Sequence, residues 1–195
     1  MTRETTHPPP PALYRYGQRR YLEPFVASGR VSMALADTYR DTLLCDGQRD
    51  DETARTLADG TRLQFTGRNR KPLIYYLLCF SLVYDPVFFT TFKADACVKI
   101  NNPEAFGDRL LAEARRQVPD QNAIQGCDLY GRPLLYYPDG FWPSVTDQIE
   151  LIFSKNQRFA YQREFRVIFA TDPLFTMKKR IEFVLGDMTD IAEFL

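Results

Sequence analysis

The sequence pattern centres on the run Phe159-Ala-Tyr-Gln-Arg-Glu-Phe-Arg-Val-Ile-Phe169. Aromatic and β-branched residues favour a strand, and successive side chains of a strand point to opposite faces. One face then carries the apolar side chains, namely Tyr161, Phe165, Val167 and Phe169. The other face carries the polar side chains, namely Gln162, Glu164 and Arg166. We expect the first face to pack in a core and the second to form a site.

Further strand patterns lie on both sides of this run. We expect strands at residues 13–16, 30–35, 73–83, 96–100 and 179–185, and two short strands about Gly131 within residues 127–137. The segment 73–83 is apolar on both faces, which is typical of a central strand that is covered on both sides. Residues 36–70 carry a weaker pattern, in which Asp59-Gly60 is a turn between a small hairpin's strands at 53–57 and 61–66.

Helices are expected at residues 18–28, 102–118 and 144–154, with a short one after Gly186-Asp187. Gly29 suits the end of the first helix. Asn102 suits the N-cap of the second, with Pro103 at the first helical position. Residues 87–92 fit a short helix or a lining loop. Because the strands come in clusters rather than in strict β-α-β alternation, the predicted class is α+β with two interleaved sheets and a few helices.

Length and composition indicate one globular domain. The chain has 195 residues, of which 45% are hydrophobic and 26% charged, which is typical of a globular protein rather than a disordered one. Residues 1–12 contain Pro8-Pro-Pro-Pro11 and are expected to be a flexible lead-in, so the domain spans 13–195. No apolar run reaches the roughly 18 residues that a membrane span needs, and no secretory signal is expected.

The charged residues exclude some functions and leave others open. Lys plus Arg and Asp plus Glu number 25 each, so the net charge attracts neither nucleic acid nor an anionic membrane. The basic runs Arg68-Asn-Arg-Lys71 and Lys178-Lys-Arg180 fit either a binding surface or solvated charge. The one histidine is His7, so a histidine-dependent triad and an ordinary zinc site are excluded, and we expect no metal.

Neither the glycines nor the cysteines form a known motif. No G-x-G-x-x-G or G-x-x-x-x-G-K-[ST] run occurs, which argues against a Rossmann or P-loop nucleotide site. The four cysteines form no C-x-x-C pair, and they are Cys45, Cys79, Cys97 and Cys127. This spacing fits free thiols in a reducing cytosol.

Arg15 is the first candidate site residue. It alternates with Tyr14 and Tyr16, so if the tyrosines face the core, Arg15 shares the opposite face with Leu13. A guanidinium can hold a pair of phosphate oxygens through two parallel hydrogen bonds. The alternative is a structural ion pair with a carboxylate such as Glu23.

Ser81 and Glu164 are the other candidates. A serine such as Ser81, at the end of a buried strand, is more often satisfied by a neighbouring carbonyl than catalytic. A carboxylate such as Glu164, within an aromatic strand, indicates a partner or a function. Gln162 and Arg166 offer the partner, and the alternative is a Glu164–Arg166 pair on a solvated sheet face.

These motifs, in this order, resemble an uncharacterised bacterial family with Y-R, C-F-S and Y-x-x-E-[WF]-R signatures, a distant branch of the ADP-ribosyltransferase-like superfamily. The matching runs are Leu13-Tyr-Arg-Tyr16, Ser28-Gly-Arg-Val-Ser32, Leu78-Cys-Phe-Ser81, Tyr84-Asp-Pro-Val-Phe-Phe89, Tyr161-Gln-Arg-Glu-Phe-Arg166 and Phe183-Val-Leu-Gly186. Each is short, so the specificity lies in their order and spacing. The resemblance implies a split β-sheet core of two packed mixed sheets with a few flanking helices.

The resemblance also implies roles of the Arg-Ser-Glu class. Arg15, with Tyr14 beside it, would hold the phosphates and ribose of NAD, and Ser81 would lie by the nicotinamide ribose. Glu164 would be catalytic, because a carboxylate stabilises the oxocarbenium-like cation that forms when the nicotinamide–ribose bond breaks. Gln162 would engage the acceptor, and Arg166 would support Glu164. The remaining candidates are aromatic walls for nicotinamide or adenine, with ordinary core packing as the alternative, and they are Tyr84, Phe88 and Phe89.

The function that the resemblance implies is an NAD-dependent mono-ADP-ribosyltransferase, with NAD as substrate and no metal. It would be a bacterial toxin or effector, or a conflict-system enzyme, that modifies a protein or nucleic acid. Its setting would be the cytoplasm or the cytoplasm of a target cell, with an immunity protein or antitoxin as a further partner and no membrane. The alternatives are an NAD glycohydrolase and a catalytically inactive binding module.

Overall fold

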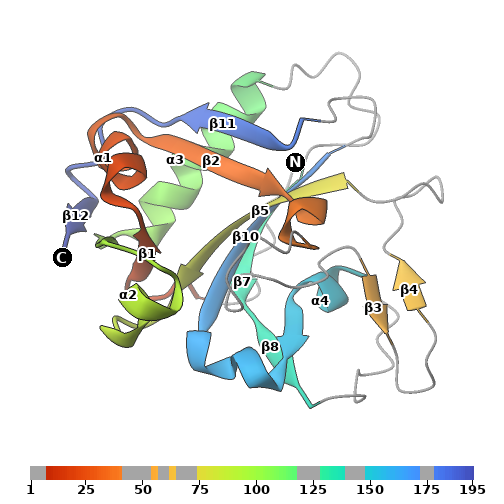
Figure 1. Ribbon diagram of the computed structural model, residues 1–195. Helices are drawn as coiled ribbons and strands as arrows, with labels where there is room; N and C mark the ends of the chain where they lie inside the picture. Colours follow the sequence, from red (N-terminus) through yellow and green to blue (C-terminus); the bar gives the residue numbers. More distant parts are fainter. Residues whose placement is uncertain are drawn as a thin grey trace.

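The computed structural model describes residues 8–40, 54–56, 62–64, 74–117, 128–138, 148–171 and 178–195 (Figure 1). Its main element is an eight-stranded sheet. The strands are β1 (Leu13–Gly17), β2 (Arg30–Leu35), β5 (Ile74–Ser81), β6 (Ala96–Ile100), β7 (Asp128–Pro133), β10 (Glu164–Thr171), β11 (Arg180–Val184) and β12 (Ala192–Phe194). The coarse prediction of an α+β fold is confirmed.

Strand β5 is the point at which this sheet divides. One edge of β5 pairs with β10 from Ser81↔Glu164 onward, and β7 pairs with the far edge of β10. The other edge of β5 is shared: Leu77 pairs with Ala34 of β2, whereas Ser81 pairs with Tyr14 of β1. Residues 78–80 have no strand partner on that edge among the described residues.

Two branches therefore leave β5. One runs through β2 to β11, and the other through β1 and β6 to β12. The two mixed sheets that we expected are, in the structure, branches of one sheet whose pairs are antiparallel. The difference arises because β5 contributes hydrogen bonds to both branches.

Helices α1 (Arg19–Ser28) and α3 (Pro103–Gln117) cover one face of the sheet. Leu22 and Phe25 of α1 and Phe106 and Leu110 of α3 pack in the larger core with apolar side chains from seven of the strands. The expected boundaries hold: Asn102 Oδ1 accepts from the backbone N–H of Ala105 over 3.0 Å, and α1 ends at a left-handed glycine.

That glycine is Gly29, with φ of 63°, and its N–H donates to the carbonyl of Phe25 over 3.0 Å. Its backbone lies against the chain before β12. A Cβ added to Gly29 would lie 2.4 Å from the carbonyl oxygen of Gly186. A glycine is therefore needed here both for the positive φ and for the close approach.

The opposite face of the sheet is covered by a smaller core. Tyr75 and Leu77 of β5 and Ile168 of β10 pack there. They contact Ile152, the last residue of α4 (Gln148–Ile152), and Phe153, which follows it. The 3₁₀ helix η1 (Ala36–Arg40) contributes Ala36. Strand β5 is thus covered on both faces, as its unbroken apolar run predicted.

The remaining elements are short. The hairpin β3 (Ala54–Thr56) and β4 (Arg62–Gln64) is antiparallel, which confirms the expected hairpin. Residues Val87–Thr91 form the short helix α2. Strands β8 (Leu135–Tyr137) and β9 (Ser154–Asn156) form a parallel pair, and the 3₁₀ helix η3 spans Gln157–Gln162.

Three expectations about local structure are wrong. The two strands within 127–137 meet at Leu134 rather than Gly131, because Leu134 N–H donates to Glu164 and the next N–H, of Leu135, donates to Phe153. The helix expected to reach Ser154 ends at Ile152, because Ser154 starts β9. The segment after Gly186 ends in β12 rather than a helix, since the free edge of β6 offers it hydrogen bonds.

Several expectations fall outside the described residues. They concern the segments 1–7, with His7, and 68–71, as well as Cys45 and Cys127. Of the other cysteines, Cys97 is buried, Cys79 is half-buried, and both are free thiols. Within the described ranges, no helix combines the length and the apolar character that a membrane crossing requires.

Candidate functional site

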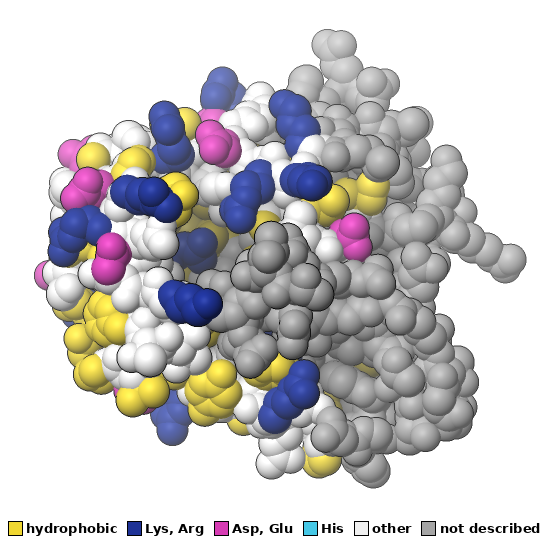
Figure 2. All heavy atoms as spheres, viewed as in Figure 1, with side chains coloured by type: hydrophobic (Ala, Val, Ile, Leu, Met, Phe, Trp, Pro, Cys, Tyr) yellow, Lys and Arg dark blue, Asp and Glu magenta, His cyan; other side chains and the backbone are white. Residues whose placement is uncertain are grey.

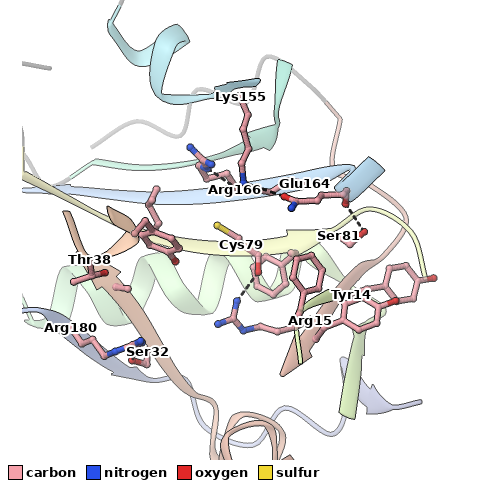
Figure 3. Close-up of a pocket in the computed structure, with 17 residues that line it drawn as sticks. Tyr14, Arg15, Ser32, Thr38, Cys79, Ser81, Lys155, Glu164, Arg166 and Arg180 are labelled. Atoms are coloured by element: carbon pink, nitrogen blue, oxygen red, sulfur yellow. Dashed lines mark hydrogen bonds and ion pairs between the residues drawn. The ribbon is translucent and has the colours of Figure 1, made fainter. Parts of the chain in front are cut away.

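A pocket lies where the sheet divides, between β1 and β2 (Figure 3). Its volume is about 210 Å³, and Arg15, Ser81, Gln162 and Glu164 line it together with Arg166. The pocket thus brings together residues from β1, the end of β5 and the start of β10. In Figure 2, the region between β1 and β2 is hollowed and has Lys and Arg side chains in and around it.

Glu164 is the carboxylate of this pocket, and it is 5% exposed. Its Oε1 accepts from Arg166 Nε over 2.9 Å, and its Oε2 accepts from Lys155 Nζ over 3.1 Å. Burial alone would raise the pKa of Glu164, but the charges of Arg166 and Lys155 and a hydrogen bond from the Cys79 thiol lower it to about 2. Glu164 is therefore ionised at neutral pH.

Arg166 is held on the same face and is 1% exposed. Besides Glu164, its Nη1 donates to the carbonyl of Ile152 over 2.7 Å. The alternative of a Glu164–Arg166 pair on a solvated sheet face is thus wrong, because α4 and the segment after it cover that face. The backbone N–H of Glu164 is also satisfied, since it donates to the Tyr136 hydroxyl over 2.8 Å.

Gln162 reaches the pocket by a route that the sequence did not predict. The run 159–162 is part of η3 rather than of the strand, and Arg163 then adopts a left-handed conformation with φ of 42°. Strand β10 begins only at Glu164. The alternation that put Tyr161 on the core face therefore fails, and Tyr161 is 49% exposed. Gln162 is nonetheless buried beside Glu164.

Lys155 is the site residue that the sequence analysis missed. It is 4% exposed, and its Nζ donates to Gln162 Oε1 and to Glu164 Oε2, each over 3.1 Å. Its ammonium also lies 4.6 Å from the centre of the Phe159 ring. Lys155 follows an apolar run that we expected to be helical, where a lysine would face solvent. Its contacts depend on the turn that η3 makes, which no local pattern reveals.

Ser81 lies directly opposite Glu164 in the sheet. Its hydroxyl donates to the backbone carbonyl of Gln162 over 2.9 Å, and it accepts from the N–H of Val83 over 3.2 Å. The alternative that this serine is satisfied by a neighbouring carbonyl therefore holds. Ser81 ties the end of β5 to the residue that leads into β10, and its side chain still lines the pocket.

Arg15 lies at the divide itself. Its Nη1 donates over 2.6 Å to the carbonyl of Cys79, which belongs to the part of β5 that has no strand partner on this edge. No ion pair joins Arg15 to Glu23 or another carboxylate among the described residues. Burial lowers the pKa of Arg15 from its ordinary value, with the charge of Arg180 acting in the same direction.

The condition that the tyrosines beside Arg15 face the core is not met. Leu13 packs in the larger core, whereas Tyr14 and Tyr16 are half-buried and line the pocket. The reason is that Tyr14 pairs with Ser81, which in turn pairs with Glu164, so these three side chains share one face of the sheet. Tyr14 thus lies in the pocket, as the resemblance implied.

The three aromatic residues expected as pocket walls lie outside the pocket lining. Phe88 is buried in an aromatic cluster, with its ring 5.3 Å from that of Tyr16. Phe89 lies at the same distance on another side of Tyr16, and Tyr84 stacks on Tyr16 at 6.4 Å. The alternative of ordinary core packing therefore holds for Phe88. The cluster packs against Tyr16 and so supports β1.

Among the described residues that line the pocket, cations outnumber carboxylates. The charged ones are Glu164 and four cations, namely Arg15, Lys155, Arg166 and Arg180. In the described part of the chain, no three His, Cys, Asp or Glu side chains are grouped as a metal site would require. The Cys79 thiol, beside Glu164, has its pKa raised by burial and by that carboxylate. A pocket of this charge suits an anionic ligand.

No protein-family model, curated protein or solved structure matches this chain. The resemblance to the ADP-ribosyltransferase-like superfamily therefore rests on the order of the short motifs alone.

Proposed function

We propose that the protein is an NAD-dependent ADP-ribosyltransferase whose site is the pocket at the divided sheet. One observation carries the proposal: Arg15, Ser81 and Glu164, which lie far apart in the sequence, line the same pocket. The Y-R, C-F-S and Y-x-x-E-[WF]-R motifs thus converge in space, whereas the 84–89 and 183–186 runs lie outside the pocket lining. Nothing in their sequence separation alone requires this.

The proposed reaction separates the substrate into a neutral leaving group and a cation, and Glu164 is the group that would stabilise the cation. When the bond between nicotinamide and ribose breaks, its electron pair leaves with nicotinamide and positive charge develops on the ribose. Glu164 supplies a fixed negative charge in a buried site, where such a charge acts strongly. Gln162, held beside Glu164 by Lys155, would face the acceptor, whose nucleophile bonds to the ribose carbon and releases its proton to solvent.

The fit to NAD is partial in volume and good in charge. The pocket of about 210 Å³ is smaller than the roughly 300–1,000 Å³ typical of small-molecule sites. It suits the nicotinamide riboside end, with the diphosphate toward Arg15 and the adenosine outside. The acceptor, a protein or nucleic acid, and an immunity protein or antitoxin belong to the same proposal, as does action as a toxin or effector.

A second candidate is a binding module for an anionic ligand. The observation that favours it is the engagement of both Glu164 oxygens by buried cations, which leaves the carboxylate fewer lone pairs for a ribose hydroxyl. An NAD glycohydrolase, with water as the acceptor, would use the same pocket as the transferase.

The test measures nicotinamide release from NAD by the purified chain, with and without cell extract as a source of acceptor. Glu164→Gln removes the charge but leaves Lys155 and Arg166 buried without it, so Glu164→Asp, which keeps the charge and loses reach, is measured beside it. Both variants should lose turnover, and Glu104→Gln, on an exposed turn of α3, should not. Absence of release by the folded wild type under all conditions leaves the binding module.

A further inference from the structure

The two branches of the sheet each present an arginine to the pocket. Arg15 comes from β1, and Arg180 comes from the first position of β11, where it pairs with Ala34 of β2. Figure 3 shows the Arg15 side chain reaching toward Cys79 of β5 and the Arg180 side chain beside Ser32 of β2. Arg180 also places a member of the basic run Lys178-Lys-Arg180 in the pocket, which favours the binding reading of that run over solvated charge.

The charges of the pocket divide into two groups. Lys155 and Arg166 are both in contact with Glu164. Arg15, by contrast, donates to a backbone carbonyl, and Arg180 Nη1 lies 3.5 Å from the hydroxyl of Ser32. Within the described ranges, neither arginine forms an ion pair with a carboxylate.

The two arginines bring like charges to one pocket, and the charge of Arg180 acts against that of Arg15. A guanidinium has five N–H donors. The hydrogen bonds of Arg15 to Cys79 and of Arg180 to Ser32 each use one of them. An anion between the two would reduce the repulsion and take up further donors.

We infer that Arg15 and Arg180 form a two-guanidinium subsite for a phosphate-bearing ligand, with Ser32 as an additional hydroxyl donor. The planar forks of the two side chains match the oxygens of phosphate groups, and two cations suit a diphosphate better than a single phosphate. The inference rests on the proposed function for the identity of the natural ligand, which is the diphosphate of a dinucleotide. The subsite itself is tested with an inorganic anion.

Arg180 is the residue on which the test turns, because its side chain is exposed and its loss leaves β5 undisturbed. Binding of pyrophosphate to the full chain is measured by calorimetry at low and constant ionic strength. We expect Arg180→Gln to bind at least about tenfold more weakly, because it loses the charge of the guanidinium and its charge-assisted hydrogen bonds to the anion. Arg180→Lys should recover part of the affinity.

Arg30→Gln is the matched control. Arg30 is also exposed and lies on the neighbouring strand, where it pairs with Val184 at the far end of β11. The Arg30→Gln variant loses the same charge at a position outside the pocket lining. It should therefore bind pyrophosphate as the wild type does. Unchanged affinity in Arg180→Gln, an equal loss in Arg30→Gln, or no binding by the wild type would each overturn the inference.

The outcome is separable from that of the proposed function. If the wild type binds pyrophosphate with the predicted dependence on Arg180 but releases no nicotinamide, the subsite stands and the transferase proposal fails. If the wild type cleaves NAD and Arg180→Gln has an unchanged KM, the subsite fails and the transferase proposal stands.

Discussion

Arg166 and Glu164 lie two residues apart on β10, and Arg166 Nε donates to Glu164 Oε1 over 2.9 Å in a buried environment. Removing one partner of such a pair leaves a buried charge with less compensation, which typically costs about 3–5 kcal/mol. We expect Arg166→Met to lower the free energy of unfolding by an amount near the lower end of that range, because Glu164 keeps its contact with Lys155. Urea denaturation followed by circular dichroism measures this.

The same pair makes a prediction about coupling. The double variant Arg166→Met/Glu164→Gln removes both charges of the pair, so its loss of stability should be smaller than the sum of the two single losses. Additive losses would show that the contact contributes no stability of its own.

Acid should act on the protein through Glu164. Its pKa in the folded protein is about 2, below the ordinary value of 4.5, so its ionised form stabilises the fold above pH 4.5. That contribution is lost as the pH falls from 4.5 toward 2. The difference in unfolding free energy between the wild type and Glu164→Gln should therefore shrink over this window. A difference that stays constant with pH would contradict the clamped, ionised carboxylate.

Lys155 should position Glu164 and Gln162 rather than react. Lys155→Met removes one of the two cations that hold the carboxylate, so the pKa of Glu164 should rise, and Lys155→Arg should restore most of the shift. Carbon NMR of the labelled carboxylate measures this without reference to any activity. Under the proposed function, Lys155→Met should also stop releasing nicotinamide at a higher pH than the wild type does as the pH is lowered. An unchanged titration of Glu164 would remove Lys155 from this role.

Gly29 and Gly186 form a matched pair for a stability test. Both have positive φ, of 63° and 84°, which costs a non-glycine residue about 1–2 kcal/mol. At Gly29 a Cβ would also meet the carbonyl of Gly186 at 2.4 Å, whereas at Gly186 nothing lies within 4 Å. Gly29→Ala should therefore destabilise the protein more than Gly186→Ala. Equal shifts in thermal unfolding would mean that the chain relaxes around the added methyl group.

Local sequence patterns predicted the secondary structure correctly where a strand or helix depends mainly on its own residues. The apolar run of β5, the Asn102-Pro103 start of α3 and the Gly29 end of α1 all follow from propensity and periodicity. The C-terminal segment could not be predicted in this way. Its residues pair with the free edge of β6, and a hydrogen-bonded neighbour overrides a weak helical preference.

The site divides along the same line. The shared face of Glu164 and Arg166 follows from alternation, and its burial follows only from the cores that form around it. Gln162 was placed near Glu164 for the wrong reason, since a left-handed residue at Arg163 separates η3 from β10. Lys155 precedes the turn of η3, and Arg180 comes from another strand, so only the folded chain brings them to the pocket.

The divided sheet affects how the protein avoids edge-to-edge association with other chains. An unbranched sheet has two outer strands, whereas the described residues of this one leave β7, β11 and β12 outermost, and exposed outer strands invite pairing with other chains. The chain limits each of them by a device known to discourage such pairing. Strand β12 has three residues, β7 ends in Pro133, and β11 begins with Arg180. Charge at that position thus protects an outer strand as well as facing the pocket.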